Sequence, residues 1–437
     1  MKHIDRQILQ IALPSIVSNI TVPLLGLIDV AIVGHLGSPA YIGAIAVGGM
    51  LFNIIYWIFG FLRMGTSGMT SQAYGKRDLP EIVRLLMRSV GIGLAVALCL
   101  ILLQVPIRQT AFLIIHPTAE VREMATLYFH ICIWGAPAML GLYGLSGWFI
   151  GMQNSRIPMY IAITQNIVNI IASLSFNCIF KKKVEGVAFG PLIAQYAGFI
   201  MGLVLWMSRY GKLKKYILWK GVLQKEAMMR FFQVNRDIFL RTLCLVTVTL
   251  FFTSAGASQG EIILAVNTLL MQLFTLFSYV MDGFDYAGEA LSGRYIGARH
   301  RQAFNHTTRP LCSGGGWLAA FFTLVYALGG NAFLGLLTDN KDVVSAAGTY
   351  FYWALAIPVA GIAAFIWDGI FIGATATRGM LASMAIAAIS FFVVYYGLRP
   401  VLGNHALWLA FLVYLAMRGV VQTLLSPKII KENFTQP

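Results

Sequence analysis

The stretch that decides the fold is YFHICIWGAPAMLGLYGLSGWFIGMQNSR at residues 128–156, because it returns 222 residues later as YFYWALAIPVAGIAAFIWDGIFIGATATR at residues 350–378. Eight of the 29 positions are identical without a gap, whereas apolar composition alone predicts about two. The same offset places Gly75 and Arg77 on Gly297 and Arg299. We therefore predict a duplicated chain with two similar halves.

The composition excludes a soluble protein. Of 437 residues, 58% are hydrophobic and only 11% are charged, whereas about a quarter are charged in soluble domains. The net charge of +15 would suit nucleic acid if the basic residues formed one polar face, but they lie mostly in short loops between apolar runs. We expect a membrane protein that contacts lipid and binds no nucleic acid.

Twelve apolar runs are long enough for helices that cross about 30 Å of hydrocarbon. They lie near residues 8–33, 41–64, 90–107, 127–150, 158–180, 187–207, 238–255, 262–291, 311–337, 347–372, 380–399 and 405–425. We predict an all-α polytopic fold in which two six-helix bundles, 1–207 and 237–437, are joined by a basic cytoplasmic linker at 208–236. Because six is even, the bundles form a parallel internal repeat, which is typical of several secondary transporters.

Basic residues are distributed unequally between the two sides of the predicted membrane. One side carries 25 Lys and Arg and the other carries 7. Short loops rich in these residues stay in the cytoplasm, so both termini are expected to be cytoplasmic. The linker, in which Trp219, Phe231 and Phe232 stand among basic residues, is expected either to lie as a helix on an anionic membrane surface or to be a plain connection.

Asp29, in LLGLIDVAIVGHLG at residues 24–37, is an ionisable residue inside the first apolar run. Such residues are costly in a membrane and usually functional. Burial penalises the charged form of a carboxyl, so Asp29 is suited to take up a proton when shut from water and to lose it when opened. The alternative is a structural role, either in an ion pair or at a helix break near Pro14 and Pro23.

The fifth predicted helix carries Gln165, Asn169 and Ser173 at intervals of four residues, together with Asn166. This spacing places the three on one helix face. Their amides and hydroxyl would hydrogen-bond a protonated Asp29 or coordinate a cation. The alternative is that they only hold membrane helices together.

Acidic residues of the second half form another polar group. The acidic ones in the eighth helix are Asp282, Asp285 and Glu289, while Arg241 lies in the seventh helix and Asp368 in the tenth. They predict either a second polar site or an ion-pair network in which Arg241 pairs with the eighth-helix acids. Asp368 has the neutral Ser146 as its repeat counterpart, which indicates different roles for the two halves.

Six side chains are expected to line a substrate cavity: Asn19, Tyr56, Trp57, Met139, Tyr143 and Gln165. A wall of aromatic and sulfur side chains suits flat, lipophilic cations. The five cysteines, at 99, 132, 178, 244 and 312, form no CxxC pair and predict neither disulfides nor a metal site. No nucleotide-binding or hydrolase motif is present in the sequence, so we expect neither an enzyme nor a cofactor.

Several segments together resemble the multidrug and toxic compound extrusion (MATE) family, and more narrowly its branch named for the DNA-damage-inducible protein F. They are GLIDVAIVGHLG at 26–37, RMGTSGMTSQAYGKRD at 63–78, GWFIGMQNSRIPM at 147–159, GFDYAGEALSGRYIGAR at 283–299 and DGIFIGATATR at 368–378. The resemblance spans nearly the whole chain. It implies a twelve-helix transporter with a central cavity that exports organic cations in exchange for protons or Na⁺.

In that branch the first-helix aspartate is the protonation site, and it falls on Asp29, while the asparagine of the same site falls on Asn169. The family's second carboxylate falls on Ser173 and its polar sixth-helix residue on Pro191, which favours a proton over Na⁺. The expected protein is a monomer in the plasma (inner) membrane of a bacterium, without a resident metal or cofactor. The alternatives are Na⁺-coupled export, a lipid-linked precursor flippase and a membrane enzyme.

Overall fold

The computed structural model describes residues 2–35, 37 and 39–435, so the expected bundle ends at 1 and 437 lie outside the described residues. The described chain is helical almost throughout and contains no strand. It divides into two compact units. The N-terminal unit is Val17–Phe232, and the C-terminal unit is Met1–Ile16 with Gln233–Pro437. The first turns of the first helix therefore group with the second half of the chain, and most of the expected linker groups with the first half.

Fifteen α-helices and two short 3-10 helices make up the described chain. They are α1 (Lys2–Gly34), α2 (Pro39–Ile58), α3 (Phe61–Lys76), α4 (Leu79–Leu102), α5 (Gln104–Ile115), α6 (Ala119–Cys132), η1 (Ile133–Gly135), α7 (Ala136–Gly151), α8 (Arg156–Cys178), α9 (Lys183–Arg209), η2 (Gly211–Tyr216), α10 (Lys225–Ala257), α11 (Glu261–Gly297), α12 (Arg301–Leu337), α13 (Lys341–Gly373), α14 (Thr377–Leu402) and α15 (Asn404–Thr435).

Twelve helical spans are long and apolar enough to cross a membrane, and each overlaps one predicted run. The all-α class and the number of spans are confirmed. Two spans are interrupted, at Phe59–Gly60 between α2 and α3 and by η1 between α6 and α7. The predicted start of the third run, at residue 90, is wrong, because the helix begins eleven residues earlier. Helix α4 begins at Leu79, where the Asp78 carboxylate accepts a hydrogen bond from the Glu81 amide and Pro80 occupies the first turn.

The internal repeat is visible in the backbone of both units. Asp78 caps α4 through the amide three residues later, and His300, 222 positions further on, caps α12 in the same way. The glycines of α7 and α13 repeat as well. A Cβ at Gly147 would collide with the carbonyl of Arg63, and one at Gly369 with that of Asp285, again at equivalent positions. The close approach of α7 to α3 therefore recurs between α13 and α11.

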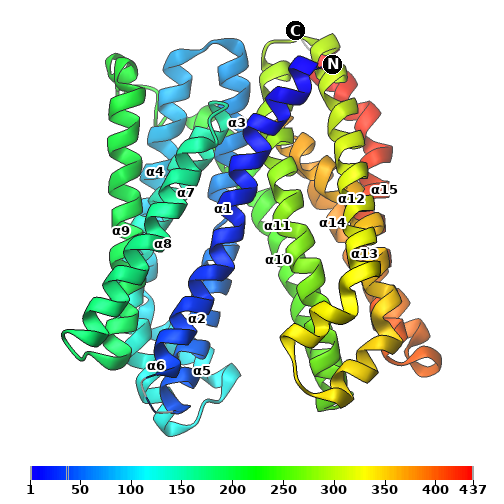
Figure 1. Cartoon of the computed structure of the whole chain (residues 1–437). Coiled ribbons are helices and arrows are strands. Elements are labelled where there is room, and N and C mark those ends of the chain that lie inside the picture. Colours follow the sequence, from blue (N-terminus) through cyan, green and yellow to red (C-terminus); the bar gives the residue numbers. More distant parts are fainter. Residues whose placement is uncertain (1, 36, 38, 436–437) are drawn as a thin grey trace. The chain divides into compact units, whose positions relative to one another are not determined.

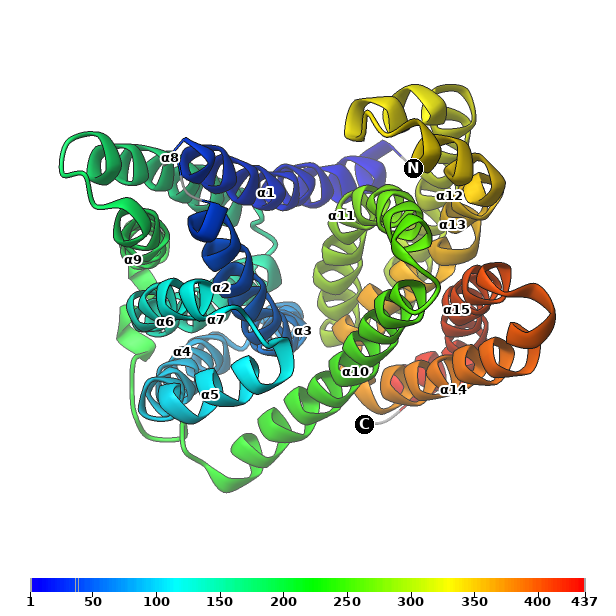
Figure 2. The ribbon, with the colours of Figure 1, turned by 90° about the horizontal axis from the view of Figure 1, so that it is seen from below.

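Within each unit, helices pack in pairs around a small number of central ones. In the N-terminal unit α8 runs along α9, and α7 packs against α3 and α4 (Figure 1). In the C-terminal unit α13 packs against α11 and α15, and α14 lies beside α15 (Figure 2). Figure 1 also shows the start of α1 and the end of α15 at the same end of the C-terminal unit, as an even number of spans requires.

The expected linker is not a surface helix. After η2 the chain is irregular to Gln224, and the remaining residues are already the first turns of α10. The irregular part is held by Arg88 of α4, which is buried. Its guanidinium donates to the carbonyls of Val222 at 2.7 Å and Gly221 at 3.0 Å, and it pairs with Glu81 at 2.9 Å.

Replacing Arg88 by glutamine is expected to destabilise the N-terminal unit. Two loop carbonyls would lose a charged donor, and such hydrogen bonds contribute about 1.5 to 3 kcal/mol each. We expect a loss of about 2 to 4 kcal/mol, measured by thermal unfolding of the purified protein in neutral detergent. Arg84→Gln is the matched control, because Arg84 lies one turn earlier, is about one third exposed and contacts Glu81 only at 3.7 Å. Equal melting temperatures for the two variants would contradict the anchoring role of Arg88.

Candidate functional site in the N-terminal unit

Asp29 lies in the second half of α1 and is only 8% exposed. The flanking residues, Ile28 and Val30, are apolar and offer the carboxyl group no polar side chain. Its one described hydrogen-bond partner is Asn169 of α8, whose Nδ2 donates to Asp29 Oδ1 at 2.9 Å. The predicted contact between the first helix and the polar face of the fifth span therefore exists.

The hydrogen bonds continue from Asn169 along α8. Ser173 Oγ donates to Asn169 Oδ1 at 3.5 Å, and Asn177 Nδ2 donates to the Ser173 carbonyl at 2.8 Å. Asn169 and Ser173 are both fully buried. The structure thus brings the three predicted coupling residues, Asp29, Asn169 and Ser173, into one connected group.

Glycines of α9 form the other wall of this group, which sequence reasoning missed. A Cβ at Gly190 would collide with Ser173 Oγ and crowd Asn169 Oδ1. Gly186 lies in the same way against Asn177, and Gly198 against Gln165. The signal was present in the sequence, since these glycines are spaced by four and eight residues, a pattern typical of close helix packing in membranes. The polar face of α8 therefore lies between α1 and α9.

This packing decides what the amides of α8 face. Gln165, expected in the substrate cavity, packs against Gly198 of α9. Asn166 donates to the carbonyl of Ala162 in its own helix at 3.1 Å. Pro191 lies inside α9 next to Gly190 and offers no side-chain ligand. The single carboxylate of the group is Asp29, and its neighbours are neutral.

Such an arrangement is suited to a carboxyl that changes its protonation state. The carbonyl oxygen of a neutral carboxylic acid accepts a hydrogen bond, as a carboxylate oxygen does. The contact from Asn169 can therefore orient Asp29 in both states. Among the residues that the structure describes, no basic side chain forms an ion pair with Asp29 that would fix its negative charge, and no group of three or more His, Cys, Asp or Glu residues able to hold a metal ion occurs.

The remaining predicted cavity residues occupy different environments. Tyr143 of α7 donates its hydroxyl to the carbonyl of Tyr56 in α2 at 3.1 Å, and Tyr56 packs against Phe52 with ring centroids 5.7 Å apart. Met139, Tyr143 and Asn19 are half-buried. Trp57 is 42% exposed. Of this set, Tyr56 and Tyr143 are joined by a direct hydrogen bond.

A separate charged cluster lies in the C-terminal unit. Asp368 of α13 accepts hydrogen bonds from Arg241 of α10 and Arg418 of α15, each at 2.5 Å to the same oxygen, and from Gln422 at 2.5 Å to the other. All four side chains are buried. Among the described ion pairs, Arg241 contacts Asp368 and not the predicted Asp282 or Glu289, because α10 presents Arg241 to α13.

The three acids of α11 have their own surroundings. Asp285 and Glu289 are buried and Asp282 is half-buried. Arg418 and Gln422 were not identified from the sequence, although an arginine within an apolar run is itself a signal.

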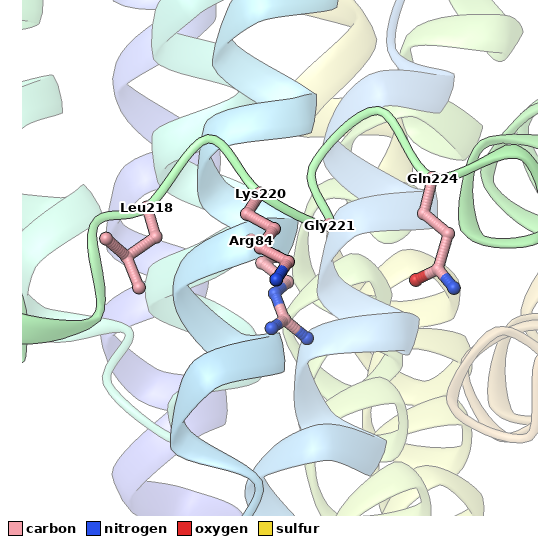
Figure 3. Close-up of a pocket in the computed structure, with 5 residues that line it drawn as sticks. All are labelled: Arg84, Leu218, Lys220, Gly221 and Gln224. Atoms are coloured by element: carbon pink, nitrogen blue, oxygen red, sulfur yellow. The ribbon is translucent and has the colours of Figure 1, made fainter.

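A pocket lies elsewhere in the N-terminal unit. It is lined by Arg84 of α4 and by Leu218, Lys220, Gly221 and Gln224 of the irregular loop before α10 (Figure 3). None of the six predicted cavity residues lines it. The five cysteines are free thiols in the structure.

Comparison with known proteins accounts for the duplication. A sequence model of the MatE family matches the chain twice, over residues 14–174 and 238–398, once in each half. The chain is 39% identical over 420 residues to the DNA damage-inducible protein F of Escherichia coli (strain K12), covering 95% of this chain and 90% of the relative. It is 24% identical to Protein DETOXIFICATION 44, chloroplastic, of Arabidopsis thaliana, covering 95% and 81%.

Solved structures share the same fold. A crystal structure of MATE in the bent conformation matches with a TM-score of 0.89 and 18% identical residues, covering 98% of this chain and 96% of that one. At this level of identity the match concerns the fold alone.

Proposed function

The chain belongs to the MATE family of multidrug and toxic compound extrusion transporters, and we propose that it exports lipophilic organic cations in exchange for protons, with Asp29 as the coupling carboxyl. It is a multi-pass membrane transporter and not an enzyme. The observation that carries the proposal is the buried contact between Asp29 and Asn169.

The side-chain groups around Asp29 favour a proton over Na⁺ as the coupling ion. A dehydrated Na⁺ needs several oxygen ligands and compensating negative charge, whereas a proton needs one carboxyl and a hydrogen-bonding neighbour. The group around Asp29 supplies one carboxylate, the amide of Asn169 and the hydroxyl of Ser173.

The second half offers a poorer coupling site. Asp368 is held by two guanidinium groups and an amide. Exchange of a cation there would require the transient separation of two buried ion pairs, which is costly. We therefore assign the coupling ion to the first half.

The proposed membrane is the plasma membrane of a bacterium, with both termini in the cytoplasm. The excess of 25 over 7 basic residues in alternate connections supports this orientation. With that orientation, protons enter the cell as the organic cation leaves.

Reconstitution into liposomes with separately imposed gradients tests the function. The vesicles are loaded with a fluorescent lipophilic cation such as ethidium, and its release is followed after a pH step without Na⁺ or after a Na⁺ step at constant pH. An inwardly directed proton gradient alone should drive efflux. Transport that needs a Na⁺ gradient and ignores the pH step would overturn proton coupling and direct attention to Asp282, Glu289 and Asp368.

Ser173→Asp is expected to add Na⁺ stimulation to the proton-driven rate. The substitution would place a second carboxylate beside Asn169 and supply the charge that Na⁺ requires. Because Gly190 packs closely on Ser173, the melting temperature is measured alongside transport. Ser173→Asn is the matched control, since it has nearly the same size and no charge. Equal Na⁺ responses in both variants would show that charge at this position does not select the ion.

A further inference from the structure

The loop between the two halves is strongly basic and has no acidic residue. From Arg209 to Lys225 it carries six Lys and Arg, and no Asp or Glu. We call residues 209–225 the linker segment. It connects the end of the span Lys183–Arg209 to the start of the span Lys225–Ala257, so both of its ends lie where membrane spans end.

The linker segment has a fixed position on the N-terminal unit. Arg88 holds the carbonyls of Gly221 and Val222, and Val222 itself is buried. Gly221 has φ of 89°, and a Cβ there would stand 3.0 Å from Arg84 Nε. Only glycine therefore lets the loop turn beside the Arg84 guanidinium. The pocket is formed by this turn.

The pocket presents cationic groups that the described contacts do not neutralise fully. Lys220 and Arg84 both line it, with Gln224 at its edge (Figure 3). Arg84 contacts Glu81 at 3.7 Å, but Glu81 forms its shorter pair, at 2.9 Å, with Arg88. A phosphate would find an arginine, a lysine and an amide donor here.

Large apolar side chains stand exposed on the same segment. Leu218 is 62% exposed, Trp219 76% and Leu223 74%. Tryptophan beside lysine is the composition found at the boundary between headgroups and acyl chains. A soluble anion would need none of these apolar side chains, whereas a phospholipid would contact the basic side chains with its headgroup and the apolar ones with its acyl chains.

We propose that the linker segment is a binding site for an anionic phospholipid, in which Arg84 and Lys220 contact the headgroup phosphate and Leu218 and Trp219 contact the acyl region. The site fastens the connection between the halves to the bilayer surface. It is independent of the coupling ion and of the exported substrate.

Native mass spectrometry of the full-length protein in neutral detergent tests this proposal. The protein is titrated with phosphatidylglycerol, with zwitterionic phosphatidylcholine and with sn-glycerol 3-phosphate. The double variant Arg84→Gln/Lys220→Gln should weaken phosphatidylglycerol binding by about tenfold or more, since each basic residue near an anionic surface contributes about fivefold. Trp219→Ser should weaken it while both basic residues remain.

Lys428→Gln/Lys431→Gln is the matched control, because it removes the same charge from α15 of the C-terminal unit, outside the residues that line the pocket, and should therefore change binding far less than the double variant does. Melting temperatures without added lipid verify that every variant is folded. Equal loss in the control pair, or equal binding of phosphatidylcholine, would overturn the proposal. Competition by glycerol 3-phosphate at the lipid's own concentration would also overturn it, since the site would then bind soluble phosphates.

Discussion

Replacing Asp29 by asparagine is expected to reduce proton-driven export to the level of liposomes without protein. The amide keeps the shape of the side chain and an oxygen that can accept the hydrogen bond from Asn169 Nδ2, which measures 2.9 Å in the native chain. It cannot gain or lose a proton. Coupling should therefore be lost while the fold is retained.

The measurement combines efflux under an imposed pH step with binding of the same cation at equilibrium. The variant should melt at the native temperature and still bind the cation, because only the titrating group is removed. Asp5→Asn is the matched control, since Asp5 lies in the same helix but is exposed near its start. Export at the native rate in Asp29→Asn would refute the assignment of Asp29, whatever ion drives the transporter.

Much of this site could be predicted from the sequence, because its signals are local. A carboxyl in an apolar run is costly wherever it lies, so Asp29 stands out without any knowledge of its partners. The intervals of four residues in α8 placed Asn169 and Ser173 on one face. The twelve spans follow from the apolar runs and the two halves from the duplication, since neither run length nor identities at a constant offset need tertiary information.

The sequence was less informative where long-range packing selects among partners. The predicted partners of Arg241 are the three acidic residues of the eighth span, whereas its observed partner Asp368 lies in another helix, 127 positions away. Nothing in the apolar runs shows which helix faces which, because lipid-facing and protein-facing residues are both hydrophobic. The start of α4 was missed for a different reason. The predicted run begins at residue 90, after Arg84 and Arg88, because arginines interrupt an apolar run, but Arg88 is buried by the loop that it holds.

Replacing Asp368 by asparagine is expected to have the largest effect on stability. The variant would leave the guanidiniums of Arg241 and Arg418 buried without the carboxylate that both contact at 2.5 Å. Removing one member of a buried pair costs about 3 to 5 kcal/mol. The yield of folded protein and its melting temperature should both fall sharply. Asp342→Asn at the exposed start of the same helix is the matched control and should have a small effect.

The ion-pair cluster also predicts that substitutions of its arginine and of its aspartate differ in their cost to stability. Arg241→Met leaves Arg418 and Asp368 as a one-to-one pair, so it should cost less than Asp368→Asn. Adding Arg241→Met to Asp368→Asn should recover part of the loss, because one of the two uncompensated charges is then removed. The interaction energy from this double-mutant cycle should be about 1 to 3 kcal/mol.

A structural cluster and a coupling site differ in what the surviving protein does. If Asp368 only balances two arginines, the double variant Arg241→Met/Asp368→Asn should export the cation under a proton gradient at a rate near the native one per folded molecule. Additive losses in the cycle would show that the two side chains act independently and would contradict the ion-pair assignment. Restored stability with abolished export would instead place the driving ion at Asp368, because the carboxyl would then be needed for transport after its structural role had been removed.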